Sequence, residues 1–119
     1  MKVTTNQIKM FNRWGFAYLD HEIGRFYRKL FLLTYGIKLQ RPSNSEHITI
    51  YNPADGNRAS DIKIDKLTFV IKNKLELFNE AVVLRCESVE LNAIRLAYGL
   101  DLIKPELHFC IGYLNESNS

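Results

Sequence analysis

The chain has 119 residues, of which 46% are hydrophobic and 24% charged, a composition typical of one globular domain and not of a disordered or fibrous chain. Sixteen Lys and Arg against thirteen Asp and Glu give a net charge of +3, which is too mild for a duplex-DNA-binding protein but suits a small anionic ligand. Apolar runs are short and cysteines few, so we expect residues 1–119 to form one cytoplasmic domain with no membrane span and no metal site.

The predicted elements begin with a strand in which large aromatic residues alternate with smaller ones. Trp14, Phe16 and Tyr18 would lie on one face of this strand. A helix is predicted over residues 20–35, because apolar residues recur at three- and four-residue spacing after an aspartate cap. Gly36 then supplies the left-handed residue that ends many helices.

The remaining elements are predicted from shorter patterns: strands over residues 47–51, 67–71, 81–86 and 108–113, and a helix over residues 89–98. Asn73 and Asn79 are predicted turns between strands. Residues 1–10 show too little periodicity to predict any element. The mixture of strands and helices predicts an α+β fold.

Two stretches of the chain repeat each other. Residues 35–42, Tyr-Gly-Ile-Lys-Leu-Gln-Arg-Pro, align with residues 98–105, Tyr-Gly-Leu-Asp-Leu-Ile-Lys-Pro, and a histidine-led strand follows each. The chain therefore resembles two copies of one unit, over about residues 14–57 and 62–115. Two copies are too few for a solenoid. They predict a bilobal fold, with two pseudo-symmetric lobes of antiparallel sheet and helices on the outside.

The strands that open with His47 and His108 contain a candidate catalytic pair. If the two lobes are related by a pseudo-two-fold axis, these equivalent histidines face each other on neighbouring central strands. One imidazole can then take a proton while the other gives one, as metal-free cleavage of a phosphodiester requires. Thr49 and Cys110, two residues further along each strand, would share this face. The Thr49 hydroxyl can donate to a phosphate oxygen and stabilise charge in the transition state.

Further residues are candidates to bind a nucleotide around this pair: Trp14, Tyr18, Arg41, Tyr51, Lys104 and Tyr113. Aromatic rings of the first strand can stack on bases, and the tyrosines that end the histidine strands could border the pocket. The two basic residues occupy equivalent positions of the repeat and could bind a second phosphate. Plainer alternatives are core packing for the aromatic residues and for Cys110, and surface solvation for the basic ones.

The motifs His47-Ile-Thr49 and His108-Phe-Cys110 resemble the paired His-x-Thr/Ser signatures of the 2H phosphoesterase superfamily. More narrowly, the chain is similar to bacteriophage enzymes that degrade the cyclic oligonucleotide signals of the CBASS defence system. The segments that carry this similarity are residues 15–20, 26–28, 39–42, 47–49, 94–95, 99–100 and 107–112. The resemblance implies a 2H fold and a phosphodiesterase without metal or cofactor, acting on a small cyclic or short oligonucleotide. For a phage protein it implies action in the host cytoplasm.

Two features depart from the pattern of that family. Cys110 stands where the family has Thr or Ser, and a thiol is a poorer hydrogen-bond donor, so phosphate contact and activity could be reduced. The chain ends eleven residues after His108, where the phage enzymes continue into a segment that covers the nucleotide, which leaves the substrate open. Two other functions remain open: a non-catalytic protein that sequesters a nucleotide in the same cleft, and a structural or partner-binding phage protein.

Overall fold

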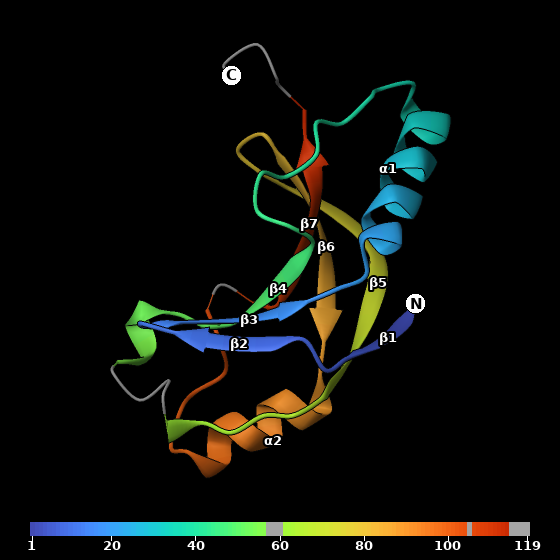
Figure 1. Cartoon of the computed structure of the whole chain (residues 1–119). Coiled ribbons are helices and arrows are strands. Elements are labelled where there is room, and N and C mark those ends of the chain that lie inside the picture. Colours follow the sequence, from blue (N-terminus) through green and yellow to red (C-terminus); the bar gives the residue numbers. More distant parts are fainter. Residues whose placement is uncertain (57–60, 105, 115–119) are drawn as a thin grey trace.

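The computed structural model describes residues 1–56, 61–104 and 106–114, which form one antiparallel sheet of seven strands with two α-helices (Figure 1). The strands are β1 (Lys2–Thr5), β2 (Ile8–Phe11), β3 (Trp14–Tyr18), β4 (His47–Tyr51), β5 (Leu67–Phe78), β6 (Ala81–Glu87) and β7 (His108–Tyr113). The helices are α1 (His21–Tyr35), α2 (Val89–Ala97) and the short 3-10 helix η1 (Pro53–Asp55). The prediction of an α+β fold is therefore confirmed.

The strand order across the sheet, β1-β5-β6-β7-β4-β3-β2, contains the same arrangement twice. In chain order, β2, β3, α1 and β4 form a first unit, residues 8–51, and β5, β6, α2 and β7 form a second unit, residues 67–113. The units add their strands to the sheet in opposite order, so β4 and β7 are neighbours at its centre, while β1 pairs with β5 at one edge. Residues 57 and 115, the expected repeat boundaries, and Pro105 lie outside the described residues.

Each unit contains a strand segment that the sequence pattern does not predict. The first unit starts at β2, an edge strand of only four residues in which two side chains are half-buried. In the second unit, the predicted turn at Asn73 is wrong, because β5 runs through this residue. Its pairing with β6 shifts register between Ile71 and Leu75, so an irregularity within the strand takes the place of a turn. The predicted turn at Asn79 is confirmed, with φ of 57°.

Both helices begin and end within one residue of the predicted positions. The Asp20 carboxylate and the Ser88 hydroxyl each accept a hydrogen bond from a backbone N–H of the first turn, at 2.8 Å and 3.2 Å. These bonds satisfy N–H groups that have no partner inside the helix. Gly36 and Gly99 follow the helices with φ of 70° and 76°, a left-handed conformation that glycine adopts at least cost.

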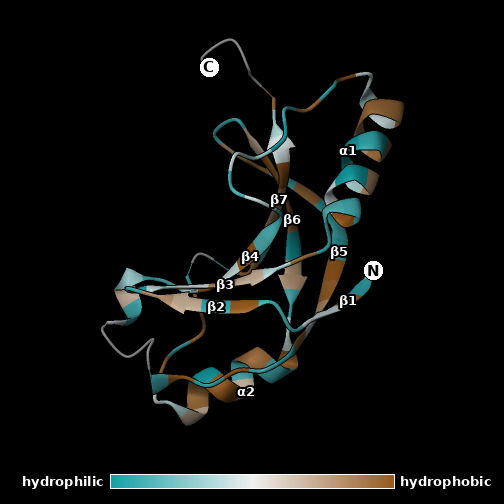
Figure 2. Ribbon diagram, in the orientation of Figure 1, coloured by the Kyte–Doolittle hydropathy of each residue, from teal (hydrophilic) through white to brown (hydrophobic). Residues whose placement is uncertain are grey.

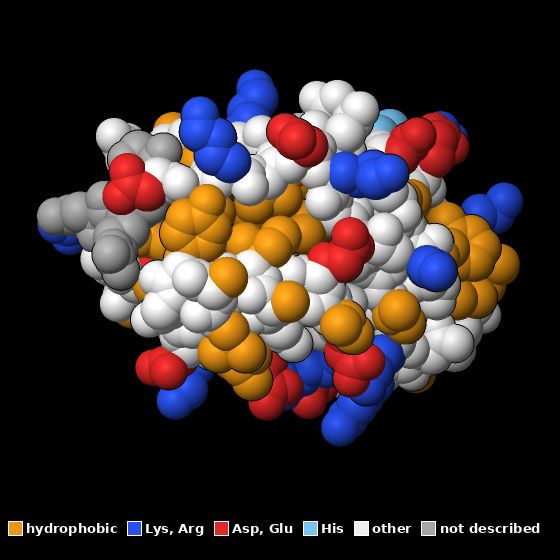
Figure 3. Space-filling model, turned by 90° about the horizontal axis from the view of Figure 1, so that it is seen from below, with side chains coloured by type: hydrophobic (Ala, Val, Ile, Leu, Met, Phe, Trp, Pro, Cys, Tyr) orange, Lys and Arg blue, Asp and Glu red, His pale blue; other side chains and the backbone are white. Residues whose placement is uncertain are grey.

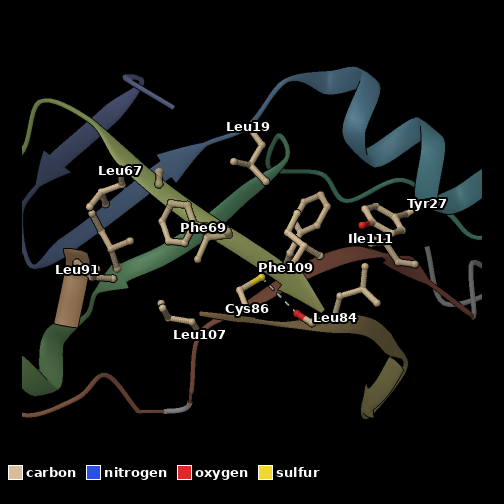
Figure 4. Close-up of a cluster of buried hydrophobic side chains, with 14 of the residues drawn as sticks. Leu19, Tyr27, Leu67, Phe69, Leu84, Cys86, Leu91, Leu107, Phe109 and Ile111 are labelled. Carbon is tan, nitrogen blue, oxygen red and sulfur yellow. Dashed lines mark hydrogen bonds between the residues drawn. The ribbon is translucent and has the colours of Figure 1, made fainter. Parts of the chain in front are cut away.

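The hydrophobic core lies between one face of the sheet and the two helices (Figure 4). Ile48 of β4 and Phe109 of β7 are both 0% exposed, and the Tyr27 ring of α1 lies 6.4 Å from the Phe109 ring. Leu91 of α2 joins the same cluster, and α1 shows both hydrophobic and hydrophilic residues along its length, as an amphipathic helix should (Figure 2). Cys86 also lies in this cluster, where burial raises the pKa of its thiol to about 12. It is therefore a neutral core residue, as expected.

An arginine on each helix, partly buried on α1 and buried on α2, binds the central strand of the other unit. Arg28 of α1 donates to the backbone carbonyl of Ile111 in β7 at 3.2 Å. Arg95 of α2 donates to the backbone carbonyl of Ile50 in β4 at 3.0 Å. These carbonyls belong to equivalent residues, each three positions after the histidine that opens its strand. These two contacts cross between the units and join them. Like the strand order, they show the same arrangement once in each unit.

Each of these arginines also pairs with a carboxylate. Arg95 binds Asp55 through two hydrogen bonds of 2.6 Å and 3.1 Å. Arg28 lies 3.3 Å from Glu46, which Arg41 also approaches at 3.6 Å. Burial acts to raise the pKa of both carboxyl groups, but the hydrogen bonds that they accept, together with the arginine charges, outweigh burial. The pKa values of Glu46 and Asp55 are therefore lowered from their ordinary values.

The outer side of α2 carries exposed hydrophobic and charged residues together (Figure 3). Val89 and Leu96 of α2 are 85% and 62% exposed, and Leu102, which follows the helix, is 55% exposed. Basic and acidic side chains are interspersed around the hydrophobic ones on the face that Figure 3 shows, in keeping with the small net charge of +3. Within the described ranges, neither helix is long and apolar enough to cross a membrane.

Candidate active site

The two histidine motifs lie on the sheet face opposite to the core. Ile48 pairs with Phe109 across β4 and β7, and both side chains are buried beneath the helices. Because side chains alternate along a strand, the residues that flank this pair point to the other face. These residues, all partly exposed, are His47, Thr49, His108 and Cys110. The structure therefore brings the four motif residues together on one surface, which we call the histidine face.

The register of β4 and β7 sets the spacing on the histidine face. Extending the pairing of Ile48 with Phe109 by one residue in each direction places His47 opposite Cys110 and Thr49 opposite His108. The two imidazoles are then diagonal neighbours, a relation in which residues lie about 7 to 8 Å apart. The register therefore brings the two histidines to one part of the histidine face.

Both histidine rings are held by the same kind of hydrogen bond. His47 Nδ1 lies 2.7 Å from the backbone carbonyl oxygen of Ser45, and His108 Nδ1 lies 2.8 Å from that of Glu106. A carbonyl oxygen only accepts, so each bond requires the proton to be on Nδ1. Nε2 is then the nitrogen that gains or loses a proton. The two histidines thus present equivalent nitrogens to a ligand on the histidine face.

A groove of about 480 Å³ opens beside Thr49 and His108. Its lining residues are Trp14, Thr49, Asn52, Pro53, Ala54, Ile103, Lys104 and His108. Asn52 donates from its side chain to the carbonyl of Lys104 at 2.8 Å, which joins the ends of the two loops that form this wall. The structure therefore places Trp14 and Lys104, both expected to bind a ligand, beside two of the four motif residues.

Aromatic rings cover the β3 side of the histidine face. The Trp14 ring is stacked on Phe16, with 5.7 Å between centroids and 20° between planes, and Trp14 remains 40% exposed. Phe16 contacts the His47 ring edge-on at 4.9 Å, and Tyr18 lies 6.1 Å from that ring. Lys9 lies 6.0 Å above the Tyr18 ring. Tyr18 is thus a neighbour of His47, although the described groove does not reach it.

Cys110 is poorly arranged to donate a hydrogen bond to a phosphate. Its Sγ lies 3.7 Å from the carbonyl oxygen of Gly112 and donates to it. Burial raises the pKa of the Cys110 thiol, so the sulfur is neutral at pH 7. The neighbouring Cys110 also raises the pKa of Tyr113, and burial acts in the same direction. Tyr113 is 40% exposed and stands beside the thiol at the end of β7.

Two residues expected at the pocket lie elsewhere. Tyr51 is 1% exposed, packs in a small apolar cluster and donates from its hydroxyl to the carbonyl of Gly56 at 3.1 Å. It pairs with Gly15 where the register of β3 and β4 shifts, so the simple alternation that would bring it to the histidine face is broken. Arg41 pairs with the buried Glu46, whereas its equivalent in the repeat, Lys104, lines the groove.

An ion-pair network beside His108 is not evident from the sequence. Arg85 of β6 lies opposite His108 and pairs with Glu76 of β5 and with Glu106. Phe78 approaches the His108 ring at 5.4 Å. These residues carry no motif, and only the register of β5, β6 and β7 brings them together. An alternation of charged residues on neighbouring strands is the one signal in the sequence, and it does not identify partners.

Comparisons with known proteins place the chain in no family. Among the described residues, no group of three or more His, Cys, Asp or Glu is arranged to hold a metal ion. No protein-family model matches the chain, and neither curated proteins nor solved structures give a significant match. Function must therefore be argued from the geometry of the histidine face.

Proposed function

We propose that this protein is a 2H-type phosphodiesterase with two lobes, one from each unit, that hydrolyses a small cyclic or short oligonucleotide. The observation that carries the proposal is the symmetric histidine pair on adjacent central strands. Each Nδ1 is held by a backbone carbonyl, at 2.7 Å for His47 and 2.8 Å for His108, so both rings offer Nε2 on one face. Such a pair supplies a general base and a general acid without a metal ion.

The proposed reaction assigns one proton transfer to each ring. Nε2 of one histidine removes a proton from a ribose 2′-hydroxyl or from water, and that oxygen forms a bond to phosphorus. The bond from phosphorus to the 5′-oxygen breaks, and Nε2 of the other histidine protonates the departing oxygen. Thr49 donates its hydroxyl to a non-bridging oxygen and stabilises the charge that builds there. Because the two rings are held alike, the geometry leaves either histidine able to begin the reaction.

The groove supports a substrate of nucleotide size. Its volume of about 480 Å³ falls in the range of small-ligand pockets. The exposed Trp14 ring offers a surface for a base, and Lys104 offers a cation for a second phosphate. The motif resemblance narrows this class to the cyclic oligonucleotide signals of bacterial defence. The protein would then be a phage counter-defence enzyme that acts in the host cytoplasm.

Cleavage of a nucleotide panel tests this proposal. The protein is incubated with cyclic dinucleotides, cyclic trinucleotides and short RNA in the presence of a chelator, and products are separated by chromatography. We expect cleavage of at least one cyclic nucleotide, and a loss of about 100-fold or more for His47→Ala and for His108→Ala. His21→Ala is the matched control, because this half-exposed histidine belongs to α1 and contacts Glu46, and it is not one of the four motif residues. Full activity in His47→Ala or in His108→Ala, or loss of activity of the unmodified protein in chelator, would overturn the mechanism.

A second candidate function is sequestration of the same ligand without cleavage. The Cys110 thiol supports it, because this sulfur donates to Gly112 of its own strand and leaves one side of a bound phosphate without a hydroxyl donor. Calorimetry on the same panel separates the two functions. Tight binding with no product over many hours favours sequestration, and Cys110→Thr then tests whether the missing donor is the reason.

A further inference from the structure

The two histidines differ in what holds the residue that anchors each ring. The His108 ring is anchored by the backbone carbonyl of Glu106 at 2.8 Å. The Glu106 side chain is in turn bound by Arg85, whose guanidinium also forms two hydrogen bonds with Glu76, one of them 3.2 Å long. Arg85 lies opposite His108 on the neighbouring strand. One guanidinium thus connects β5, β6 and the segment before β7 at the His108 ring.

The first unit has a different arrangement at the equivalent positions. The His47 ring is anchored by the carbonyl of Ser45, whose short side chain cannot reach across a strand as a glutamate can. The residue opposite His47 on the neighbouring strand is Tyr18, whose side chain is not a cation as that of Arg85 is. Aromatic contacts from Phe16 and Tyr18 surround His47 instead. In the first unit the charged contacts belong to Glu46, the residue after Ser45, which pairs with Arg28 and Arg41. The two units therefore hold the backbone beside each histidine through different carboxylates.

We propose that Arg85 is a positioning residue for His108, acting through Glu106. By binding the Glu106 carboxylate, Arg85 fixes the backbone that accepts from His108 Nδ1, and this holds the ring with Nε2 directed at the ligand. Glu76 holds the guanidinium in place from the other side. The inference rests on the proposed function for its kinetic consequence. Its structural consequence, the fixed Nδ1–H form of His108, holds whether or not the protein cleaves a nucleotide.

A direct role for Arg85 in binding the substrate phosphate is the competing explanation. The guanidinium is 27% exposed and lies on the histidine face. Both of its edges are already occupied by carboxylates, however, and an incoming phosphate would have to displace one of them. Direct binding predicts that loss of Arg85 raises KM, whereas positioning predicts that it lowers kcat at little change in KM.

Steady-state kinetics on Arg85→Met, Glu106→Gln and the double variant separate these explanations. We expect kcat to fall about 10- to 100-fold in Arg85→Met, because small displacements of a catalytic group have effects of this size. Glu106→Gln should show a similar fall, and the double variant should be no worse than either single one, since both act through one chain of contacts. Arg85→Lys should restore part of kcat. Lys72→Met is the matched control, because it removes another ion pair between β5 and β6, with Glu87, that does not contact Glu106.

Nitrogen NMR of the imidazoles gives a readout that needs no substrate. In the unmodified protein the ring shifts of His108 should report the Nδ1–H form, and Arg85→Met should shift His108 toward a mixture of the two neutral forms while His47 is unchanged. An unchanged His108 spectrum in Arg85→Met, or a rise in KM with kcat intact, would overturn the inference. A protein without nucleotide cleavage but with the expected NMR change would refute the proposed function and leave the positioning role standing.

Discussion

The first and second units share a scaffold but differ in the side chains around their histidines. In both, an arginine of a capped helix donates to the central strand of the other unit, and a backbone carbonyl two residues upstream anchors the histidine. Around His47 the neighbours are the Phe16 and Tyr18 rings and a hydroxyl on its own strand, whereas around His108 they are the Phe78 ring, an ion-pair network and a thiol. The features that position the two imidazoles are therefore duplicated, and the features that would contact a ligand have diverged.

The shared scaffold and the differing side chains correspond to two physical requirements, one for proton transfer and one for ligand contact. Two proton transfers need two similar rings at a fixed spacing, which constrains strand register, anchoring carbonyls and the arginines beneath them. A nucleotide, by contrast, is not symmetric about its phosphate, so the surfaces on the two sides need not match. Variants at equivalent positions of the two units can test each part of this interpretation.

The largest expected effect is on folding, at the two helix arginines, Arg95 and Arg28. Arg95→Met should lower the free energy of unfolding by about 3 to 5 kcal/mol, because it removes the charged partner of Asp55 and the guanidinium donor to the Ile50 carbonyl. Arg28→Met should cost less, about 1 to 2 kcal/mol, since Glu46 keeps its contacts with Arg41 and His21. Urea unfolding at pH 7 measures both. A cost at Arg28 equal to or above that at Arg95 would contradict the comparison.

The next effect concerns the hydroxyl and thiol that occupy equivalent positions. Thr49→Ala should lower kcat about 100-fold, as expected when a donor to the transition-state oxygen is lost. Cys110→Ala should cost less than about tenfold, because a thiol bound to its own strand contributes little. Cys110→Thr should preserve or raise kcat.

Turnover of the panel substrate by the three variants gives the measurement. If Cys110→Thr were as inactive as His108→Ala, the cysteine would have a role other than that of a weak donor. Loss of activity in Cys110→Ala together with inhibition by a thiol reagent would point to the same conclusion.

A smaller effect is expected in the pH dependence of stability. The folded-state pKa values of Glu46 and Asp55 are lowered from 4.5 and 3.8, so the folded protein binds fewer protons than the unfolded chain in this region. Their stabilising contribution is complete above these ordinary values and is lost as pH falls through the lower folded values. The free energy of unfolding should therefore decline on acidification below pH 4.5. The slope of this decline should be smaller in Asp55→Asn and in Glu46→Gln than in the unmodified protein. If both variants kept the slope of the unmodified protein, these two carboxyl groups would be excluded as its source.

Local patterns in the sequence predict much of this molecule. The caps and apolar spacing of residues 20–35 determine a helix, and the alternation in residues 47–50 and 108–111 determines which side chains share a face. The repeat predicts that the two histidine strands are neighbours. Each of these features depends on residues close together in the chain or on a duplicated pattern. Local patterns and duplications can both be recognised in the sequence without knowing the register of the sheet.

The features that sequence reasoning misses depend on register and on burial. Arg85 reaches Glu106 because β6 pairs with β7, and nothing near Arg85 in the chain indicates this. Tyr51 is buried because of a register shift beside Gly15, although alternation places it on the histidine face. β2 is short and lies at a sheet edge, where only weak periodicity is required.

The central claim is that His47 and His108 act as one acid and base pair, and the pH dependence of kcat/KM tests it most directly. The measurement uses the nucleotide that the panel identifies, in the presence of a chelator. We expect a bell-shaped profile, because the proposed reaction requires one ring neutral and the other charged. We also expect His47→Ala and His108→Ala each to lose the activity at every pH. A single-step profile that rises to a plateau, with activity retained in one of the two variants, would contradict the account.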